Sequence, residues 1–178
     1  MLFAIAFVFV VGGCTKRSNP IAPSSSGDEF PPDNKFSLTL YSPSSNITIG
    51  DLFDVRLVLY NVTGVSGMAV DVSFPATSVT VLGILSSTTF FPADSAISLS
   101  RTEADSGKMS FGVSYRNAAT GISKSGSGLI CTFKCKAKAP GAALFVIDQS
   151  TLRVTTPSGT LIDNFSTLLI ENLSITIH

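Results

Sequence analysis

Hydrophobic and polar residues alternate with a period of two in short runs from Phe36 to the C-terminus. Clusters of Gly, Pro, Ser and Asn separate the runs, and no stretch has the periodicity of an amphipathic helix. The pattern predicts an all-β protein whose nine short antiparallel strands form a two-sheet sandwich. The predicted strands are residues 36–41, 53–60, 68–74, 79–85, 95–101, 108–115, 128–138, 143–148 continued by 152–155, and 168–177.

The alternation also assigns side chains to the two faces of each strand. The predicted inward residues are Phe53, Val55, Leu57 and Leu59 in the second strand, Met68, Val70, Val72 and Phe74 in the third, and Leu129, Cys131, Phe133, Cys135 and Ala137 in the seventh. The predicted outward residues are Asp54, Arg56, Val58 and Tyr60, then Ala69, Asp71 and Ser73, and finally Ile130, Thr132, Lys134, Lys136 and Lys138.

Cys131 and Cys135 therefore share the core face of the seventh strand. Four residues along a strand separate two Cα atoms by roughly 13 Å, which is beyond the reach of a disulfide. We predict that both are buried free thiols that pack as small hydrophobic side chains.

The chain begins with the apolar run Leu2–Val11, followed by Gly12, Gly13 and Cys14. The run is too short for a membrane-spanning helix, which needs about 20 residues, and has the length of a signal-peptide core. The segment Val11-Gly12-Gly13-Cys14 resembles a bacterial lipobox. We therefore predict a signal peptide over residues 1–13 and lipidation of Cys14. The alternative is an ordinary cleaved signal peptide, since no Lys or Arg precedes the apolar run.

Residues 15–35 are rich in Pro and Ser and lack any apolar periodicity, so residues 14–35 are expected to form an extended linker from the lipid to one domain at 36–178. A lipidated cysteine with more than one acyl chain anchors a protein stably, at about 0.8 kcal/mol per buried methylene. The expected location is the bacterial cell envelope, facing the periplasm or the exterior, with the lipid as the only membrane contact.

Charge and residue types exclude several function classes. The net charge is zero and only 13% of residues are charged, so the basic excess of a nucleic-acid-binding protein is missing. The single histidine, His178, is C-terminal, so no His-dependent nucleophile or His metal cluster is expected. Carboxylates that a glycosidase could use lie in turns or on solvated strands, namely Asp51, Asp54, Asp71, Asp94, Glu103 and Asp105. We predict no enzyme, no cofactor and no metal site.

Two charged segments allow more than one interpretation. The turns at residues 51–54 and 103–106 could contribute calcium ligands, but Asp and Ser in such turns more often form hydrogen bonds within the turn. The row Lys134, Lys136 and Lys138 could bind an anion, but a solvated strand face that discourages edge-to-edge pairing is the favoured interpretation.

Carbohydrate binding on a sandwich usually needs exposed aromatic rings. The chain has no Trp, which leaves Tyr60, Tyr115, Phe90 and Phe91 as candidates. Phe90 and Phe91 are instead expected to plug the open end of the sandwich.

The order of several short segments resembles a cohesin domain. In the first half these are Gly50–Val55, Asn61–Val65, Gly67–Phe74 and Val79–Gly83; in the second half they are Phe111–Tyr115 and the run Gly126–Gly141 with its Pro140-Gly141 turn. The resemblance covers residues 36–177 and implies a nine-stranded jelly-roll sandwich with one sheet of strands 5, 6, 3 and 8 and another of strands 4, 7, 2, 1 and 9.

Cohesins bind dockerins, which are small calcium-loaded modules, through the outer face of the sheet with strands 8, 3, 6 and 5. The resemblance thus implies a partner-binding face here, with the calcium belonging to the partner. The implied positions are Gly67, Ala69, Asp71, Ser73, Arg101, Glu103, Ser110, Ser114 and Arg116.

Two functions remain open at this point. The first is a surface-anchored module that binds a dockerin-like protein. The second is a lipoprotein that binds polysaccharide or supports the cell envelope on the same scaffold, because a fold alone does not fix the partner.

Overall fold

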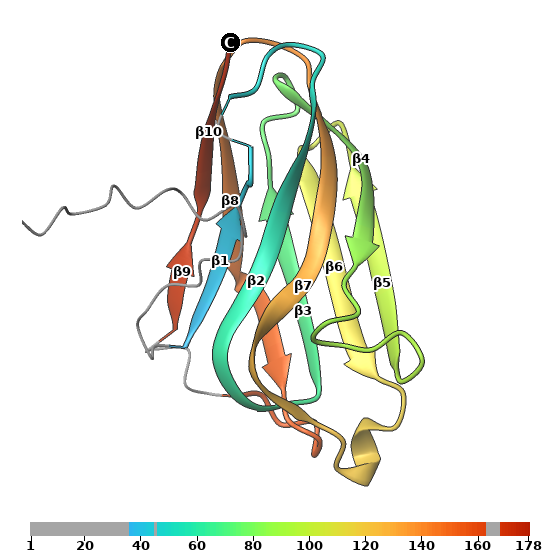
Figure 1. Ribbon diagram of the computed structural model, residues 1–178. Coiled ribbons are helices and arrows are strands. Elements are labelled where there is room, and N and C mark those ends of the chain that lie inside the picture. Colours follow the sequence, from blue (N-terminus) through green and yellow to red (C-terminus); the bar gives the residue numbers. More distant parts are fainter. Residues whose placement is uncertain (1–35, 45, 163–167) are drawn as a thin grey trace, which may run out of the picture.

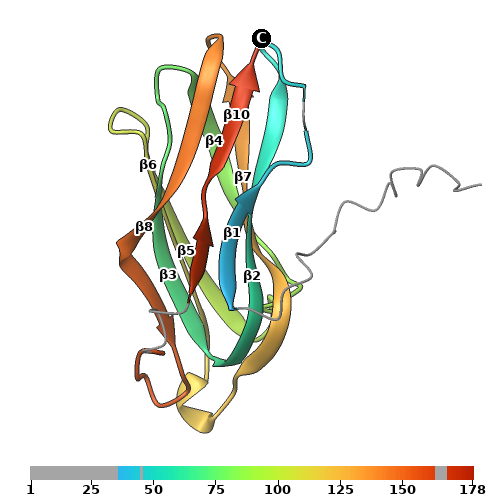
Figure 2. The same ribbon diagram turned by 90° about the vertical axis from the view of Figure 1, so that its left-hand side faces the viewer.

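The computed structural model describes residues 36–44, 46–162 and 168–178, which form two β-sheets packed face to face (Figures 1 and 2). Turns rich in Gly, Pro and Asp end the strands, as the sequence pattern indicates. The strands are β1 (Ser37–Tyr41), β2 (Leu52–Val65), β3 (Gly67–Ser73), β4 (Val79–Ser86), β5 (Ala96–Glu103), β6 (Lys108–Tyr115), β7 (Lys124–Ala137), β8 (Gly141–Thr155), β9 (Leu169–Glu171) and β10 (Leu173–Ile177), with a 3-10 turn η1 (Ala118–Thr120).

Each sheet has five strands. The first sheet has the order β4-β7-β2-β1-β9, and the second sheet has the order β10-β8-β3-β6-β5. Neighbouring strands are antiparallel except for β1 and β9, which run parallel. The all-β sandwich and the sheet assignments of the first eight predicted strands are confirmed.

The predicted single C-terminal strand over residues 168–177 is wrong in one respect, because the chain changes sheets at Asn172 and the strand count is ten. In Figures 1 and 2, β9 lies beside β1, and β10 continues beside β8. The Oδ1 atom of Asn172 accepts a hydrogen bond from the Ile147 N–H at 2.9 Å. This side chain satisfies a β8 backbone donor at the crossing point, so the two short strands can pair with different sheets.

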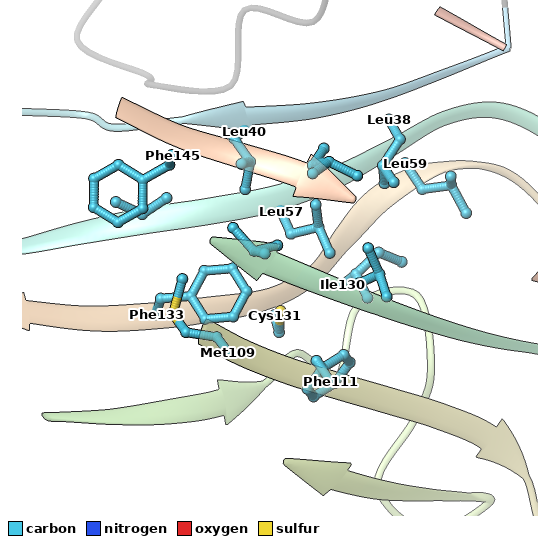
Figure 3. Packing of buried hydrophobic residues seen from close by; sticks show 14 of the residues in the cluster. Leu38, Leu40, Leu57, Leu59, Met109, Phe111, Ile130, Cys131, Phe133 and Phe145 are labelled. Atoms are coloured by element: carbon cyan, nitrogen blue, oxygen red, sulfur yellow. The ribbon is translucent and has the colours of Figure 1, made fainter. Parts of the chain in front are cut away.

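The core lies between the sheets and consists of inward side chains from both (Figure 3). The predicted inward residues of β2 and β3 are all buried, which confirms the alternation there. Phe133 from the first sheet and Phe145 and Met109 from the second are among the largest fully buried side chains. All residues of the buried cluster lie between Leu38 and Ile177, so the described core is formed within the segment 36–178.

The alternation fails in one part of β7. Leu57 pairs with Cys131 but Val58 pairs with Leu129, so Ile130 is an extra residue in a β-bulge. Ile130 is therefore fully buried beside Cys131, whereas Leu129 is only half-buried, which reverses the prediction for these two residues. Two further predicted outward residues, Val58 and Tyr60, are also buried, which reverses the prediction for them as well.

Cys131 and Cys135 are buried free thiols, as predicted. Burial raises the pKa of Cys131 well above its ordinary value. Burial, together with the negative charge of Asp54, raises the pKa of Cys135 to about 12. Neither sulfur therefore has the thiolate character that nucleophilic or redox chemistry needs.

The lysine row on β7 does not guard a sheet edge, because β7 lies between β4 and β2. That part of the interpretation is wrong, although the residues do face solvent: Lys134 forms an ion pair with Asp54 at 2.8 Å, and Lys136 is exposed. The turn interpretation of Asp51 is confirmed, because its carboxylate accepts hydrogen bonds from the Thr48 N–H and hydroxyl at 2.9 and 2.8 Å.

The predicted signal peptide, the lipidated Cys14 and the linker lie outside the described residues. Among the residues that are described, none belongs to a helix long and apolar enough to cross a bilayer.

Candidate partner-binding face

The outer face of the second sheet brings together the residues that the sequence predicts for partner binding. β3 lies at its centre, between β8 and β6, and β5 forms one edge. Ala69 and Ser73 are exposed and Asp71 is half-buried, so the outward side of β3 is confirmed. The cross-strand pairs Ala69–Gly112 and Gly112–Leu99 continue the same face across β6 to β5.

Small residues make the middle of this face shallow and open. Gly112 has no side chain, and Ala69 beside it contributes only a methyl group. A hollow of about 490 Å³ lies over these two residues and is bordered by Leu99, Ser114 and Arg153. Such a surface can accept apolar side chains from a partner without rearranging long side chains of its own.

Gly67 belongs to this face but is buried, which corrects the prediction that it is an outward contact residue. A Cβ atom at Gly67 would lie 3.0 Å from Thr155 Oγ1 and 3.1 Å from Ser114 Oγ. The Thr155 hydroxyl donates a hydrogen bond to the Gly67 carbonyl at 3.3 Å. The neighbouring hydroxyl side chains therefore close this end of β3, and Ser114 and Thr155 present the surface there.

Asp71 is a charged residue on the central strand of the face. Its carboxylate lies 2.7 Å from Lys108 Nζ on β6. Partial burial acts to raise the pKa of Asp71, but hydrogen bonds from Lys108, Ser110 and Thr151, together with the charge of Lys108, lower it overall. Asp71 is therefore a carboxylate paired with Lys108.

Arg101 and Glu103 lie on the β5 edge of the same face. Their side chains form an ion pair at 3.2 Å that is largely exposed to solvent. Exposed pairs of this kind contribute little to stability, so both groups can exchange partners at low cost. Arg116 follows β6 and is exposed at the Ile97 end of the face.

β8 is continuous, although the sequence pattern predicts it as two pieces. Asp71 pairs with Asp148 and Ala69 with Arg153, so β8 contains extra residues that bulge out of the ladder. Asp148 Oδ1 accepts hydrogen bonds from the Ser150 N–H and hydroxyl at 2.9 and 2.6 Å. The Thr151 hydroxyl accepts the Asp71 N–H at 3.1 Å and so replaces a missing ladder bond.

Several residues of the face were not predicted, among them Ile97, Leu99, Lys108, Asp148 and Arg153. Ile97 and Leu99 are the most informative, because they are apolar and yet 49% and 75% exposed. The alternation Ile97, Leu99, Arg101 within the predicted fifth strand was the signal that could have identified them. Asp148 and Arg153 had no comparable signal, because the bulge interrupts the period of β8.

The aromatic candidates for sugar stacking are not at the surface. Tyr60, Tyr115, Phe90 and Phe91 are 5%, 7%, 0% and 1% exposed. Phe90 and Phe91 contact each other in the loop between β4 and β5, and the Tyr115 hydroxyl donates a hydrogen bond to the Phe90 carbonyl at 3.3 Å. The platform that a carbohydrate-binding sandwich needs is therefore not formed by these residues.

No group of three or more His, Cys, Asp or Glu residues in the described ranges is arranged to hold a metal ion. The turn at Glu103 holds its carboxylate by a hydrogen bond from Ser106 at 3.2 Å, as expected for a turn-forming pair.

The sequence matches no protein-family model and no curated protein. The structure, in contrast, is similar to solved cohesin modules. A chain of a type II cohesin–X–dockerin complex from Acetivibrio cellulolyticus has a TM-score of 0.70 at 14% identity, covering 81% of this chain and 100% of that one. A cohesin of the same organism, solved in complex with a dockerin, has a TM-score of 0.66 at 15% identity, covering 80% and 98%. A non-cellulosomal cohesin from the archaeon Archaeoglobus fulgidus has a TM-score of 0.62 at 13% identity, covering 80% and 91%.

Proposed function

Because this chain has the cohesin fold, we propose that it is a non-catalytic module that binds another protein through the outer face of its second sheet. The observation that carries the proposal is the exposure of Ile97 and Leu99 beside the small residues Ala69 and Gly112. Exposed apolar side chains around a shallow hollow, with charged groups at the rim, are the usual composition of a protein–protein interface.

The partner that best fits is a dockerin-like, calcium-loaded module. Two of the solved structures with this fold are cohesins in complexes with dockerins. The face of this chain has the flat shape and the mixture of apolar and charged groups that would suit docking of a helical module. Polysaccharide is the less favoured partner, because the candidate aromatic rings are buried.

Site-specific cross-linking tests the proposal. A photoreactive phenylalanine analogue at Leu99 should cross-link a protein from the culture of the native organism, and the same analogue at Lys136 on the opposite sheet should not. Mass spectrometry should identify paired calcium loops in the cross-linked protein, and a calcium chelator should abolish its capture. The proposal is wrong if capture is equal at the two positions, if it is unaffected by chelation, or if only polysaccharide is retained.

Asp71→Arg offers a matched measurement with the captured protein. The substitution replaces the carboxylate that pairs with Lys108 and places a second cation beside Lys108. Partner affinity should fall by about 1–3 kcal/mol, as for a moderate to strong interface position. Lys136→Glu reverses a charge on the other sheet and should leave affinity unchanged.

We further propose that the domain is tethered to a bacterial membrane through a lipid on Cys14, with residues 15–35 as a spacer. Support comes from the apolar run and the Gly12-Gly13-Cys14 motif of the sequence. Cys14→Ser should abolish incorporation of labelled fatty acid and release the protein from membranes. Unchanged membrane partitioning of this variant would contradict the tether.

A further inference from the structure

The charged groups on the partner-binding face are separated along the strand direction. Arg116 and Arg153 border the hollow at the Ile97 end of the face. Asp71, Glu103 and Asp148 border a second hollow, of about 480 Å³, at the Ser73 end. Positive charge therefore lies at one end of the face and negative charge at the other, along the direction of β3. The zero net charge of the sequence does not reveal this separation.

The basic end is available for a partner's anionic group. Neither Arg116 nor Arg153 has a carboxylate within ion-pair distance among the described residues. Arg153 Nη1 donates to the carbonyls of Ser150 and Leu152, at 2.9 and 2.7 Å, which holds the guanidinium against β8. The positive charge of this end is thus positioned but not neutralised.

The acidic end has an excess of negative charge. Three carboxylates, Asp71, Glu103 and Asp148, share the second hollow with a single lysine, Lys108. The hydrogen bond and charge of Asp71, with smaller contributions from Glu103 and Asp148, raise the pKa of Lys108, which is the effect of a negative field at this place. Lys108 pairs with Asp71 and Arg101 pairs with Glu103, so Asp148 is the carboxylate of this group that has no ion pair among the described residues, and one negative charge is left over.

The separation of the two ends suits one helix. Ala69 pairs with Arg153 and Ser73 lies beside Lys108, and the four residue steps from Ala69 to Ser73 span about 13 Å along the strand. A helix covers this distance in about nine residues. Leu99, Ala69 and Gly112 line the first hollow, at the basic end of the same span.

Building on the proposed function, we propose that the partner segment carries opposite charges at its two ends. It places an acidic side chain at Arg116 and Arg153, and apolar side chains over Leu99 and Ala69. It places a Lys or Arg in the hollow bordered by Asp71, Glu103 and Asp148. The charge separation then fixes one orientation of the partner, because the reversed orientation brings like charges together at both ends.

Two synthetic helical peptides of identical composition test this inference. Both peptides have the same leucines. The charge-separated peptide carries its glutamates at one end and its lysines at the other end, whereas the mixed peptide has the two kinds of charge distributed along its length. Binding to the full chain with Cys14→Ser is measured by NMR titration at low ionic strength. We expect the charge-separated peptide to bind about fivefold more tightly than the mixed peptide, or better. This preference should be lost at 1 M salt, because the Debye length falls to about 3 Å.

A nitroxide on the acidic end of the charge-separated peptide reports the orientation of the bound peptide. It should broaden the amide signals of Gly112 and Ser114 and leave that of Gly107 sharp. In the double variant Arg116→Glu/Arg153→Glu, the preference for the charge-separated peptide over the mixed peptide should disappear. It should persist in the control Lys136→Glu/Lys138→Glu, which changes the net charge equally but at the C-terminal end of β7, in the other sheet, and just after it.

Equal affinity of the two peptides, failure of both to bind, or broadening at Gly107 would overturn the inference. These outcomes are separate from a failure of the proposed function. If the native partner cross-links at Leu99 while the peptides are not distinguished, only the charge orientation is wrong. If the native partner cross-links at Lys136 instead, the proposed binding face is wrong.

Discussion

The Asp71 Oδ2 atom and the Lys108 Nζ atom lie 2.7 Å apart on neighbouring strands of the partner-binding face. Their positions are diagonal rather than directly opposite, because Asp71 pairs with Ser110 and Lys108 with Ser73. Long side chains can bridge such diagonal positions across a sheet. The ion pair therefore connects the face that we propose for binding to the stability of the sheet beneath it.

The ion pair leads to a pH-dependent prediction. Since the folded-state pKa of Asp71 is lowered, its contribution to stability is present above the unfolded value of about 3.9 and is lost as the pH falls through the lower folded value. Asp71→Asn should therefore flatten the loss of unfolding free energy between about pH 5 and pH 2. Denaturant unfolding over this pH range measures it. Parallel curves for the wild type and the variant would show that Asp71 is not the group responsible.

Gly128 on β7 should tolerate no side chain. A Cβ atom there would lie 3.0 Å from Phe90 Cδ2 and 3.2 Å from Phe90 Cβ, and Phe90 is fully buried. Gly128→Ala should destabilise the domain by about 1–3 kcal/mol, because a filled core has to be displaced. Gly83→Ala is the control, since nothing lies within 4 Å of its Cβ position. Equal chemical denaturation midpoints for the two variants would contradict the packing described here.

Asn172 should be important for the sheet change at the C-terminus. Asn172→Ala removes the acceptor of the Ile147 N–H and should cost about 1–3 kcal/mol of unfolding free energy. Asn117→Ala serves as the control, because the Asn117 side chain makes no cap hydrogen bond at η1. Hydrogen exchange at the Ile147 amide gives a second measurement, with faster exchange expected only in the Asn172 variant.

The two buried thiols should be inert in the native protein. In Cys14→Ser, a thiol reagent at pH 8 should label neither Cys131 nor Cys135 until denaturant unfolds the domain, since both are at most 1% exposed and burial raises both pKa values. Absorbance of the released chromophore follows the reaction. Rapid labelling of either thiol without denaturant would mean that β7 opens locally.

Most of the fold follows from the local period of the sequence. The alternation in residues 53–59 and 68–74 correctly identifies the inward side chains of β2 and β3, because a strand with one buried face must repeat every two residues. The same logic places Ala69, Asp71 and Ser73 on the outside and Cys131 and Cys135 in the core.

The exceptions arise where tertiary packing overrides that period. The bulge at Ile130 shifts the phase of β7 by one residue, which local sequence does not reveal because Leu129 and Ile130 are equally apolar. The burial of Gly67 depends on Thr155, which lies 88 residues away in the chain. The crossing at Asn172 likewise depends on an amide of β8.

The sequence by itself determined most of the strands and the thiol environment, since each depends on a period of two within one segment, whereas the candidate residues of the face were implied by the resemblance to a cohesin domain. Only the tertiary structure decided how Leu99, Arg153, Asp148 and Lys108 assemble around Asp71, because their juxtaposition depends on the register between strands. That register is set by bulges and by hydrogen bonds between distant residues, such as the Asp71 N–H to the Thr151 hydroxyl. The separation of charge along the face exists only once these strands are aligned.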